Sequence, residues 1–527
     1  MLTAQDIRGL ASGSMEYKQK NRVEISFKDL NTRVVDKIKE SMLEISLESE
    51  DFSKIARDVI TDYVYTKKPY VEGYVRDGRL MVKTLTTDLH NNITSWGKLT
   101  RCRDEVKIRE IQINGEFIFV DLDNGYELLR DNEGNIIKFD NPEEGLNFIK
   151  ARLIASETRF TVEEPLVNAM TVEGFRIAAT APVINPPHPD TPTERWATAV
   201  IRKLGGLQFD TAKLVNNNTA CEPMLDWIAL TYEALLGHIV AGTTGCGKTT
   251  IQEYGMKRVR DRDRVVSIQS PTEYHYRNIV DGVMKNNAVY WEVDPDARKD
   301  TTRSASLDNL VSHTLRYTAN MDMIGELKDT TDYASAARAI NAGTKISSSL
   351  HTFDIPGILD RFALELVNAL QMDLNIAREL ACRYLGPLTL CDRLGDGSRK
   401  IMGCAEVTGY DRVHSEYLLN YLYEFILVDT IPREGEEGKL GLVWNVGYFV
   451  KRGNPAISTQ NTILKQLPRE RIQRVLDVPM GTVLKEVNFD KLPKDYVITY
   501  DSDITPHSDT EIASVNRREE DNVGIQI

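Results

Sequence analysis

The sequence lacks several features that would define other classes of protein. No stretch approaches the roughly 18 consecutive apolar residues that a membrane-spanning helix needs. The most apolar stretch, residues 418–428, is short and contains Glu424. The first 20 residues have no apolar segment of the kind found in secretory signal peptides. We therefore expect neither a membrane-spanning protein nor a small secreted scaffold.

Cysteine is scarce, and an excess of basic charge is absent. No two of the six cysteines form a C-x-x-C pair, which argues against a four-cysteine zinc site or a redox dithiol. Scattered thiols in a long chain fit a reducing cytoplasm. Lys and Arg number 65 against 78 Asp and Glu, so the net charge is −13. This balance argues against a chain dominated by nucleic-acid binding, although a local basic patch remains compatible with it.

The first part of the chain predicts a helical extension followed by an α+β domain. Residues 1–95 are charged and carry apolar residues at helical spacing. Residues 96–206 are richer in strand-forming residues, and 107–120 alternates around an Asn-Gly pair, which predicts a β-hairpin. We expect residues 207–220 to be a linker.

The second part predicts an α/β domain. Residues 221–410 alternate between short apolar strands and helical stretches, as in a mostly parallel sheet. Four strands are expected, at 237–241, 264–268, 321–324 and 345–350. Residues 411–495 predict a mixed C-terminal appendage, in which 440–450 would form two strands turned near Asn445. Residues 496–527 are polar and acidic, and we expect a disordered tail.

One motif points directly to chemistry. Residues 242–250 fit G-x-x-x-x-G-K-[ST], the loop that binds nucleotide phosphates between a strand and a helix N-terminus. Lys248 is expected to contact the outer phosphates, and Thr249 to bind Mg²⁺. The candidates for binding ATP are Gly242, Thr243, Thr244, Gly245, Cys246, Gly247, Lys248, Thr249 and Thr250.

Cys246 lies inside this loop, where its simplest role is that of a small neutral spacer. Because a helix begins just after it, we expect the pKa of its thiol to be lowered. A bulky alkylating reagent should then react readily with the Cys246 thiol, and the adduct should block nucleotide binding.

Carboxylates and a histidine follow the neighbouring predicted strands. Glu326 comes at the carboxyl end of the strand 321–324, beside the phosphates, and is the candidate catalytic residue and Mg²⁺ ligand. Asp322 is the runner-up, although strand alternation should turn it away from the site. Glu273 ends a second strand and His351 a third, where a histidine can touch the γ-phosphate. Without the loop, an exposed position at a strand end would be the better explanation of Glu326, and a packing role would be as good an explanation of His351.

Taken in order, these motifs resemble the hexameric secretion ATPases of type II secretion, type IV pili and type IV secretion. Gly242–Thr250 corresponds to that family's Walker A loop, the Glu273 strand to its aspartate box, Gly325-Glu326 to Walker B, and His351 to its histidine box. Upstream, 111–115, 164–165, 174–176 and 201–203 also fit, so that the resemblance extends over residues 107–365.

The resemblance implies an α+β N-terminal domain followed by a RecA-like P-loop ATPase domain, with extra segments at both ends of this chain. It implies a ring of six subunits that hydrolyses ATP with Mg²⁺ and uses the resulting domain movement to drive secretion or pilus assembly and retraction. Arg176 and Arg202 of the N-terminal domain, and Arg316, become candidate phosphate contacts in catalysis. The implied location is the cytoplasmic face of the inner membrane. The implied partners are inner-membrane components of the machine, with nucleic acid involved only indirectly.

Two positions depart from the family pattern. Gln269-Ser270 replaces the usual Glu-Asp, and Gly343-Thr344 replaces a common Gly-His, which together favour a slow ATPase. The tetracysteine zinc module of the type II secretion and pilus-extension branch is absent, which favours the type IV secretion or tight-adherence pilus branch. Two alternatives remain: a P-loop motor that translocates DNA and a nucleotide-binding scaffold that hydrolyses weakly.

Overall fold

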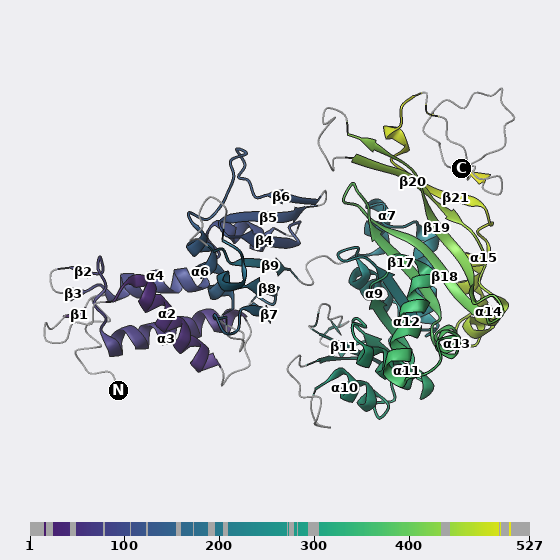
Figure 1. Ribbon diagram of the computed structural model, residues 1–527, viewed down its shortest axis with the longest axis horizontal. Coiled ribbons are helices and arrows are strands. Elements are labelled where there is room, and N and C mark those ends of the chain that lie inside the picture. The colour runs from purple at the N-terminus through teal and green to yellow at the C-terminus, as the bar shows by residue number, and fades with distance from the viewer. Residues whose placement is uncertain are drawn as a thin grey trace. The chain divides into compact units, whose positions relative to one another are not determined.

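The computed structural model of the chain forms two compact units, Met1–Gly206 and Leu207–Ile527 (Figure 1). The structure describes residues 15–16, 25–42, 49–76, 79–105, 107–122, 125–153, 160–171, 173–187, 195–203, 209–270, 272, 279–281, 283–293, 305–433, 443–494, 496 and 505–506. Within these ranges, no helix has both the length and the apolar character needed to span a membrane.

The first unit begins with a small helical bundle. Helices α2 (Phe27–Met42), α3 (Ser49–Lys67) and α4 (Val82–Thr94) enclose an apolar core in which Leu30 and Ile60 are fully buried. Three short strands lie beside them, β1 (Met15–Glu16), β2 (Val75–Arg76) and β3 (Arg79–Leu80). The turns η1 (Gly97–Leu99) and α5 (Thr100–Asp104) lead into the next layer.

A six-stranded antiparallel sheet completes this unit. Its strands, in spatial order, are β6 (Gly125–Leu128), β5 (Phe117–Leu122), β4 (Glu110–Asn114), β9 (Thr198–Arg202), β8 (Arg176–Thr180) and β7 (Leu166–Met170). Helix α6 (Pro142–Arg152) packs through Ile149 into the core that Ile177 and Ile201 share; η2 (Pro182–Ile184) is a connecting turn. The predicted hairpin is confirmed as β4–β5. A Cβ at its Gly115 would lie 2.5 Å from the Trp196 ring, so only glycine fits there.

The second unit is built on an eleven-stranded sheet, and its first half is parallel. In spatial order these strands are β14 (Ala288–Glu292), β11 (Val265–Gln269), β15 (Met321–Ile324), β16 (Lys345–Leu350), β10 (His238–Gly242) and β17 (Pro387–Arg393). The four predicted strands are confirmed as β10, β11, β15 and β16. Strands β10 and β11 are buried on both faces, as parallel strands between helical layers should be.

Helices cover both faces of this parallel half. One core holds α8 (Glu222–Glu233) and α9 (Lys248–Met256), and the other holds α10 (Leu307–Thr314), α11 (Thr330–Asn341), α12 (Ile355–Leu370) and α13 (Leu374–Tyr384). Figure 1 shows α11, α12 and α13 beside one another on the near face. Strand β16 lies between β10 and β15, which is the RecA-like arrangement: the loop strand and the Walker B strand are not neighbours. A short α7 (Thr211–Asn216) precedes α8, and β12 (Ile279–Val280) pairs with β13 (Val283–Met284).

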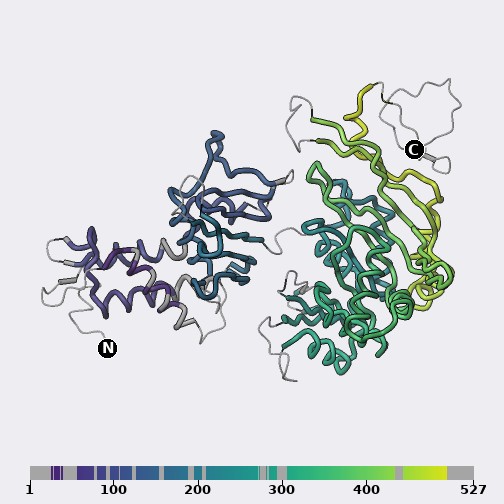
Figure 2. The backbone as a smooth tube through the Cα atoms, in the orientation of Figure 1, coloured from purple at the N-terminus to yellow at the C-terminus, as the bar shows by residue number. Residues whose placement is uncertain are grey.

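After β17, the chain continues the same sheet in antiparallel fashion. The long strands β18 (Arg399–Asp411), β19 (Glu416–Pro432), β20 (Val443–Lys451) and β21 (Thr482–Val487) run as one continuous surface, seen as extended tubes in Figure 2. Helices α14 (Ile457–Leu464) and α15 (Arg469–Leu476) pack on it, followed by η3 (Phe489–Lys491) and β22 (Thr505–Pro506). Most of the tail predicted to be disordered lies outside the described residues.

The prediction of two strands within 440–450 is wrong. Residues 443–451 form the single strand β20, which pairs with β19 on one side and β21 on the other. Asn445 is buried in that strand, where its side chain donates to the Thr430 hydroxyl (2.9 Å) and accepts from the backbone of Asp396 (2.8 Å). These long-range partners, rather than a turn, satisfy the asparagine.

Candidate nucleotide-binding site

A glycine-lined loop joins β10 to α9. Gly242, Gly245 and Gly247 have φ values of 146°, 74° and 100°, in the region that favours glycine. A Cβ at Gly242 would lie 1.9 Å from the carbonyl oxygen of Cys391, so a side chain at that position would collide with β17. The loop ends at Lys248, the first residue of α9. The sequence motif therefore forms the cradle expected of a phosphate-binding loop at a helix N-terminus.

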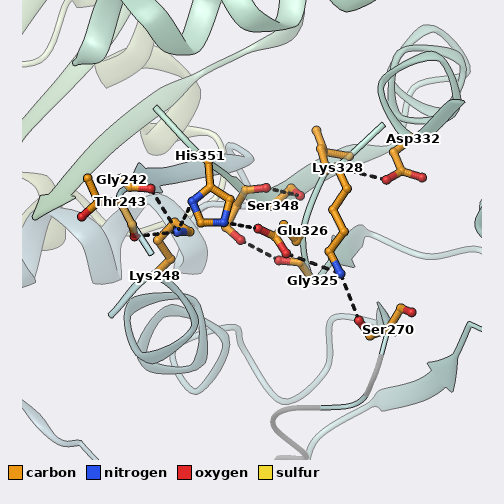
Figure 3. A network of polar contacts seen from close by, with 12 residues as sticks. Gly242, Thr243, Lys248, Ser270, Gly325, Glu326, Lys328, Asp332, Ser348 and His351 are labelled. Carbon is orange, nitrogen blue, oxygen red and sulfur yellow. Dashed lines mark hydrogen bonds and ion pairs between the residues drawn. The ribbon is translucent and has the colours of Figure 1, made fainter. Parts of the chain in front are cut away.

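The ammonium group of Lys248 is held over this loop. Nζ donates to the carbonyl oxygens of Gly242 (3.0 Å) and Thr243 (2.9 Å), and lies 3.2 Å from Nδ1 of His351 (Figure 3). The lysine is buried, although its charge would ordinarily keep it in water. A positive charge fixed at a ring of backbone groups can bind an anionic phosphate with little reorganisation.

Glu326 lies on the other side of His351. Its Oε1 is 2.8 Å from Nε2 of the histidine, and its Oε2 is 3.5 Å from Nζ of Lys328. Lys328 also donates to the carbonyl oxygen of Ser270 (3.2 Å), at the end of the neighbouring β11 (Figure 3). Thus the predicted residues Lys248, His351 and Glu326 form one network at the carboxyl ends of the parallel strands.

The two contacts of the His351 ring favour one of its protonation states. An ammonium group only donates, so Nδ1 must accept from Lys248, and Nε2–H is left to donate to the Glu326 carboxylate. Burial and the nearby charge of Lys248 lower the pKa of the imidazole, and the opposing effect of Glu326 is smaller. A neutral ring protonated at Nε2 satisfies both contacts, and in that state the contact with Glu326 is a hydrogen bond rather than an ion pair.

The Walker B turn is supported by neutral polar groups. The hydroxyl of Ser349 donates to the carbonyl oxygen of Gly325 (2.8 Å). Gln269 donates to the Ser267 hydroxyl (2.9 Å), and its Cγ would lie 3.3 Å from a Cβ at Gly325. Gln269 is 3% exposed, so the usual family carboxylate at this position would be buried against Gly325. The amide avoids that desolvation cost and also removes a negative charge from beside the site.

The other two predicted carboxylates do not join the network. Asp322 is fully buried and accepts a hydrogen bond from Thr314 of α10 (2.6 Å), and burial raises its pKa to about 6. Its hydrogen bond to Thr314 directs it toward α10. Glu273 lies outside the described residues.

Two of the three candidate arginines belong to the first unit, and the third belongs to the second unit. Arg176 and Arg202 are half-buried in the first unit, and they are direct cross-strand partners on β8 and β9, so their side chains leave the same face of the sheet. Glu110 of β4 is the partner of Arg202 on its other side. Arg316 is exposed and lies between α10 and the amino end of β15, whereas Glu326 follows the carboxyl end of that strand. The structure therefore does not bring Arg316 to the nucleotide loop of its own chain.

The expected lowering of the Cys246 pKa is wrong. Its side chain is 2% exposed and turns into the core beside Val240 and Cys391 rather than toward solvent. Burial raises the pKa of the thiol, and the opposing effect of Lys248 is smaller. Proximity in sequence to a helix N-terminus does not lower a pKa when the sulfur is desolvated.

Two residues that contact the loop could not be predicted from the sequence. The hydroxyl of Thr243 donates to Oδ1 of Asp392 (2.8 Å), and Nε of Arg399 donates to the carbonyl oxygen of Gly245 (2.8 Å). Both residues lie about 150 positions downstream, on β17 and β18. Strand pairing alone brings them to the loop.

The loop, the Walker B glutamate and the sheet order together define a RecA-like P-loop ATPase fold. Residues 149–383 match the family described as "Type II/IV secretion system protein". Competence protein ComGA of Streptococcus pneumoniae is 26% identical over 24% of this chain and 36% of its own length. Type II secretion system protein HxcR of Pseudomonas aeruginosa is 26% identical over 38% of this chain and 39% of its own length. The chain thus spans less than half of these relatives.

A solved structure, of the pilus retraction motor PilT with bound ADP, has a TM-score of 0.40 at 16% identity, covering 75% of this chain and 91% of that one. The resemblance to the type II and type IV secretion ATPases is confirmed by the family match, and the match covers residues 149–383.

Proposed function

We propose that the protein is a ring-forming ATPase motor that hydrolyses ATP to power type IV secretion, as conjugative or effector transfer, or the assembly or retraction of a pilus. The observation that carries this proposal is the Lys248–His351–Glu326 network at the carboxyl edge of the parallel strands. It holds a phosphate-binding cation and a carboxylate at opposite nitrogens of one neutral ring.

The chain's own groups suit ATP hydrolysis. The glycine loop and Lys248 would bind the phosphates, and Glu326 would orient and deprotonate the attacking water. Thr249 and Glu326 would hold Mg²⁺, which when bound neutralises charge on the phosphates. As Lys248 turns from His351 to a phosphate, Nδ1 of the ring loses its donor. His351 can then respond to occupancy of the site while still donating to Glu326.

A charge clamp from the first unit would complete the site. Arg176 and Arg202 leave one face of the sheet as neighbours, so a single domain movement can deliver or remove two positive charges. An arginine supplied in this way can be worth roughly 10³-fold or more in rate. In our proposal a homo-hexamer provides the movement at the cytoplasmic face of the inner membrane, where membrane components of the machine are its partners. Arg316, at the opposite edge of the sheet, could serve only a neighbouring subunit.

One observation favours a second candidate, the weakly hydrolysing nucleotide-binding scaffold. Gln269 places a buried amide where the family commonly has a carboxylate. If that carboxylate helps to orient water, its loss slows turnover without affecting binding.

Steady-state ATP hydrolysis over a range of protein concentrations, with and without DNA, tests the proposal. The motor predicts a rate per subunit that rises with concentration and is insensitive to DNA. Arg202→Ala should lose most hydrolysis but keep ATP affinity within about tenfold, since the clamp acts mainly in the transition state. Arg101→Ala, which removes an exposed arginine of α5, is the matched control. Slow, concentration-independent hydrolysis would favour the scaffold, and strong stimulation by DNA would favour a DNA-translocating motor.

A further inference from the structure

The hairpin formed by β17 and β18 makes two side-chain hydrogen bonds with the phosphate loop. Asp392, near the end of β17, accepts the Thr243 hydroxyl at 2.8 Å. Arg399, the first residue of β18, donates to the carbonyl oxygen of Gly245 at 2.8 Å. The two polar contacts therefore hold the loop at residues 243 and 245. We call Asp392 and Arg399 the loop clasp.

The tip of the same hairpin is fixed to the C-terminal strands. The backbone N–H of Asp396 donates to the side chain of Asn445 (2.8 Å), and the backbone N–H of Asn445 donates to the Asp396 carboxylate (3.3 Å). Asn445 in turn donates to Thr430 of β19 (2.9 Å), and both Asp396 and Asn445 are buried. Asp392 and Arg399 therefore belong to a hairpin whose tip is hydrogen-bonded to β20, and through Asn445 to β19.

We propose that Arg399 and Asp392 are positioning residues that hold the phosphate loop in its nucleotide-binding conformation. The inference rests on the proposed function, because it assigns the clasp to the same site. A segment with three glycines loses much conformational entropy when it is ordered. Contacts that order the loop before the nucleotide arrives lower the entropic cost of binding and so raise the affinity. Arg399 adds a charge-assisted hydrogen bond to the carbonyl oxygen of Gly245.

The position of the clasp predicts which kinetic constant it affects. Arg399 contacts the loop through a carbonyl oxygen, so its help is the same whether the bound nucleotide is in its ground state or reacting. Uniform binding of this kind changes KM and leaves kcat nearly unchanged. A residue that only stabilised the fold would instead lower the melting temperature and the active fraction.

The experiment compares binding of a fluorescent ATP analogue with hydrolysis kinetics in the full-length chain. Arg399→Gln should weaken binding and raise KM by about tenfold or more, as expected when a hydrogen bond from a charged group is lost. Its kcat should stay within about threefold of wild type. Arg399→Lys, which keeps a cationic donor, should recover part of the affinity. Arg474→Gln, which removes an exposed arginine of α15, is the control for loss of charge.

Asp392 provides a matched pair of variants. Asp392→Ala should weaken analogue binding, while Asp392→Asn keeps an oxygen that can accept the Thr243 hydroxyl and should bind nearly as wild type does. The inference is overturned if wild type binds the analogue and Arg399→Gln binds it equally, or if kcat and melting temperature fall together with affinity. If wild type itself binds no ATP analogue, the proposed function fails first, and the two failures are thereby distinguished.

Discussion

Nε2 of His351 lies 2.8 Å from Oε1 of Glu326, while Nδ1 of the same ring accepts a hydrogen bond from Lys248 at 3.2 Å. One neutral imidazole thus connects the residue expected to bind phosphate with the residue expected to activate water. Because a neutral ring shares one proton between its two nitrogens, a change in the contact of Nδ1 with Lys248 alters the hydrogen bond that Nε2 makes with Glu326. If Lys248 binds phosphate as we propose, this connection links occupancy of the loop to the carboxylate that we expect to activate water.

Glu326→Gln separates binding from chemistry. The amide keeps the size of the side chain and can still accept a hydrogen bond from His351, but it cannot take a proton from water. We expect ATP affinity to be retained and turnover to fall roughly 10²–10⁴-fold, the usual contribution of a general base. Single-turnover measurements with radiolabelled ATP check this directly. Turnover within about threefold of wild type would exclude Glu326 as the catalytic base and direct attention to Glu273.

The protonation of His351 gives a pH prediction. Its pKa in the folded chain lies below the ordinary histidine value of 6.5, so the unfolded chain binds more protons as the pH falls below 6.5. The contribution of this group to stability is therefore unfavourable in acid and vanishes above pH 6.5. Long-range ¹H–¹⁵N spectra should show neutral His351 protonated at Nε2 at pH 7, with His351→Gln identifying the signal. A charged ring, or the Nδ1–H tautomer, at pH 7 would contradict the network.

The thiol of Cys246 should be slow to react. It is buried and its pKa is raised, so little thiolate is present at pH 7 and reagents reach it poorly. Burial also raises the pKa of Cys382, to about 11, so access to reagent decides the order. Mass spectrometry after timed alkylation should find Cys382, which is only partly buried, labelled before Cys246. Preferential labelling of Cys246 would show that the loop opens readily, and bound ATP should then suppress it.

Two buried lysines of the second unit each make a contribution to stability that grows at alkaline pH. Lys451 is fully buried, with Nζ 3.2 Å from both the Tyr423 hydroxyl and the Val475 carbonyl oxygen, and burial lowers its pKa to about 8. Burial likewise lowers the pKa of Lys400 to about 8. Between pH 8 and the ordinary lysine value of 10.5, each of these lysines binds more protons in the unfolded chain, so its contribution to the free energy of unfolding rises with pH. The buried thiols of the same unit, whose pKa values burial raises, contribute in the opposite direction, so the lysine effect is read from the difference between variants.

Denaturant titrations at pH 8 and 10 test this effect. Lys451→Met, which keeps the apolar stem, should lower the slope of the free energy of unfolding against pH relative to wild type, because the contribution of Lys451 is removed, and exposed Lys465→Met should leave the slope unchanged. Equal slopes in all three proteins would show that Lys451 keeps its ordinary pKa.

Local patterns predicted the parts of the fold and site that depend on neighbours in sequence. The loop at 242–250 and the strands that carry Glu326 and His351 are contiguous motifs, so their chemistry can be read from the chain. The clasp residue Arg399 could not be predicted, because only pairing of β17 with β18 brings it to the loop. The errors at Asn445 and Cys246 have the same origin: burial and distant partners decided their environment, and local sequence carries neither.

We expect the loop at 242–250 to bind ATP through Lys248 and the chain to hydrolyse the bound ATP. The most direct test is Mg²⁺-dependent ATP hydrolysis by wild type and Lys248→Ala, purified in parallel, with exposed Lys465→Ala as the control. Lys248→Ala should lose ATP binding and hydrolysis together while its melting temperature without nucleotide stays close to that of wild type, whereas Lys465→Ala should hydrolyse ATP normally. Hydrolysis by Lys248→Ala at the wild-type rate would contradict the account.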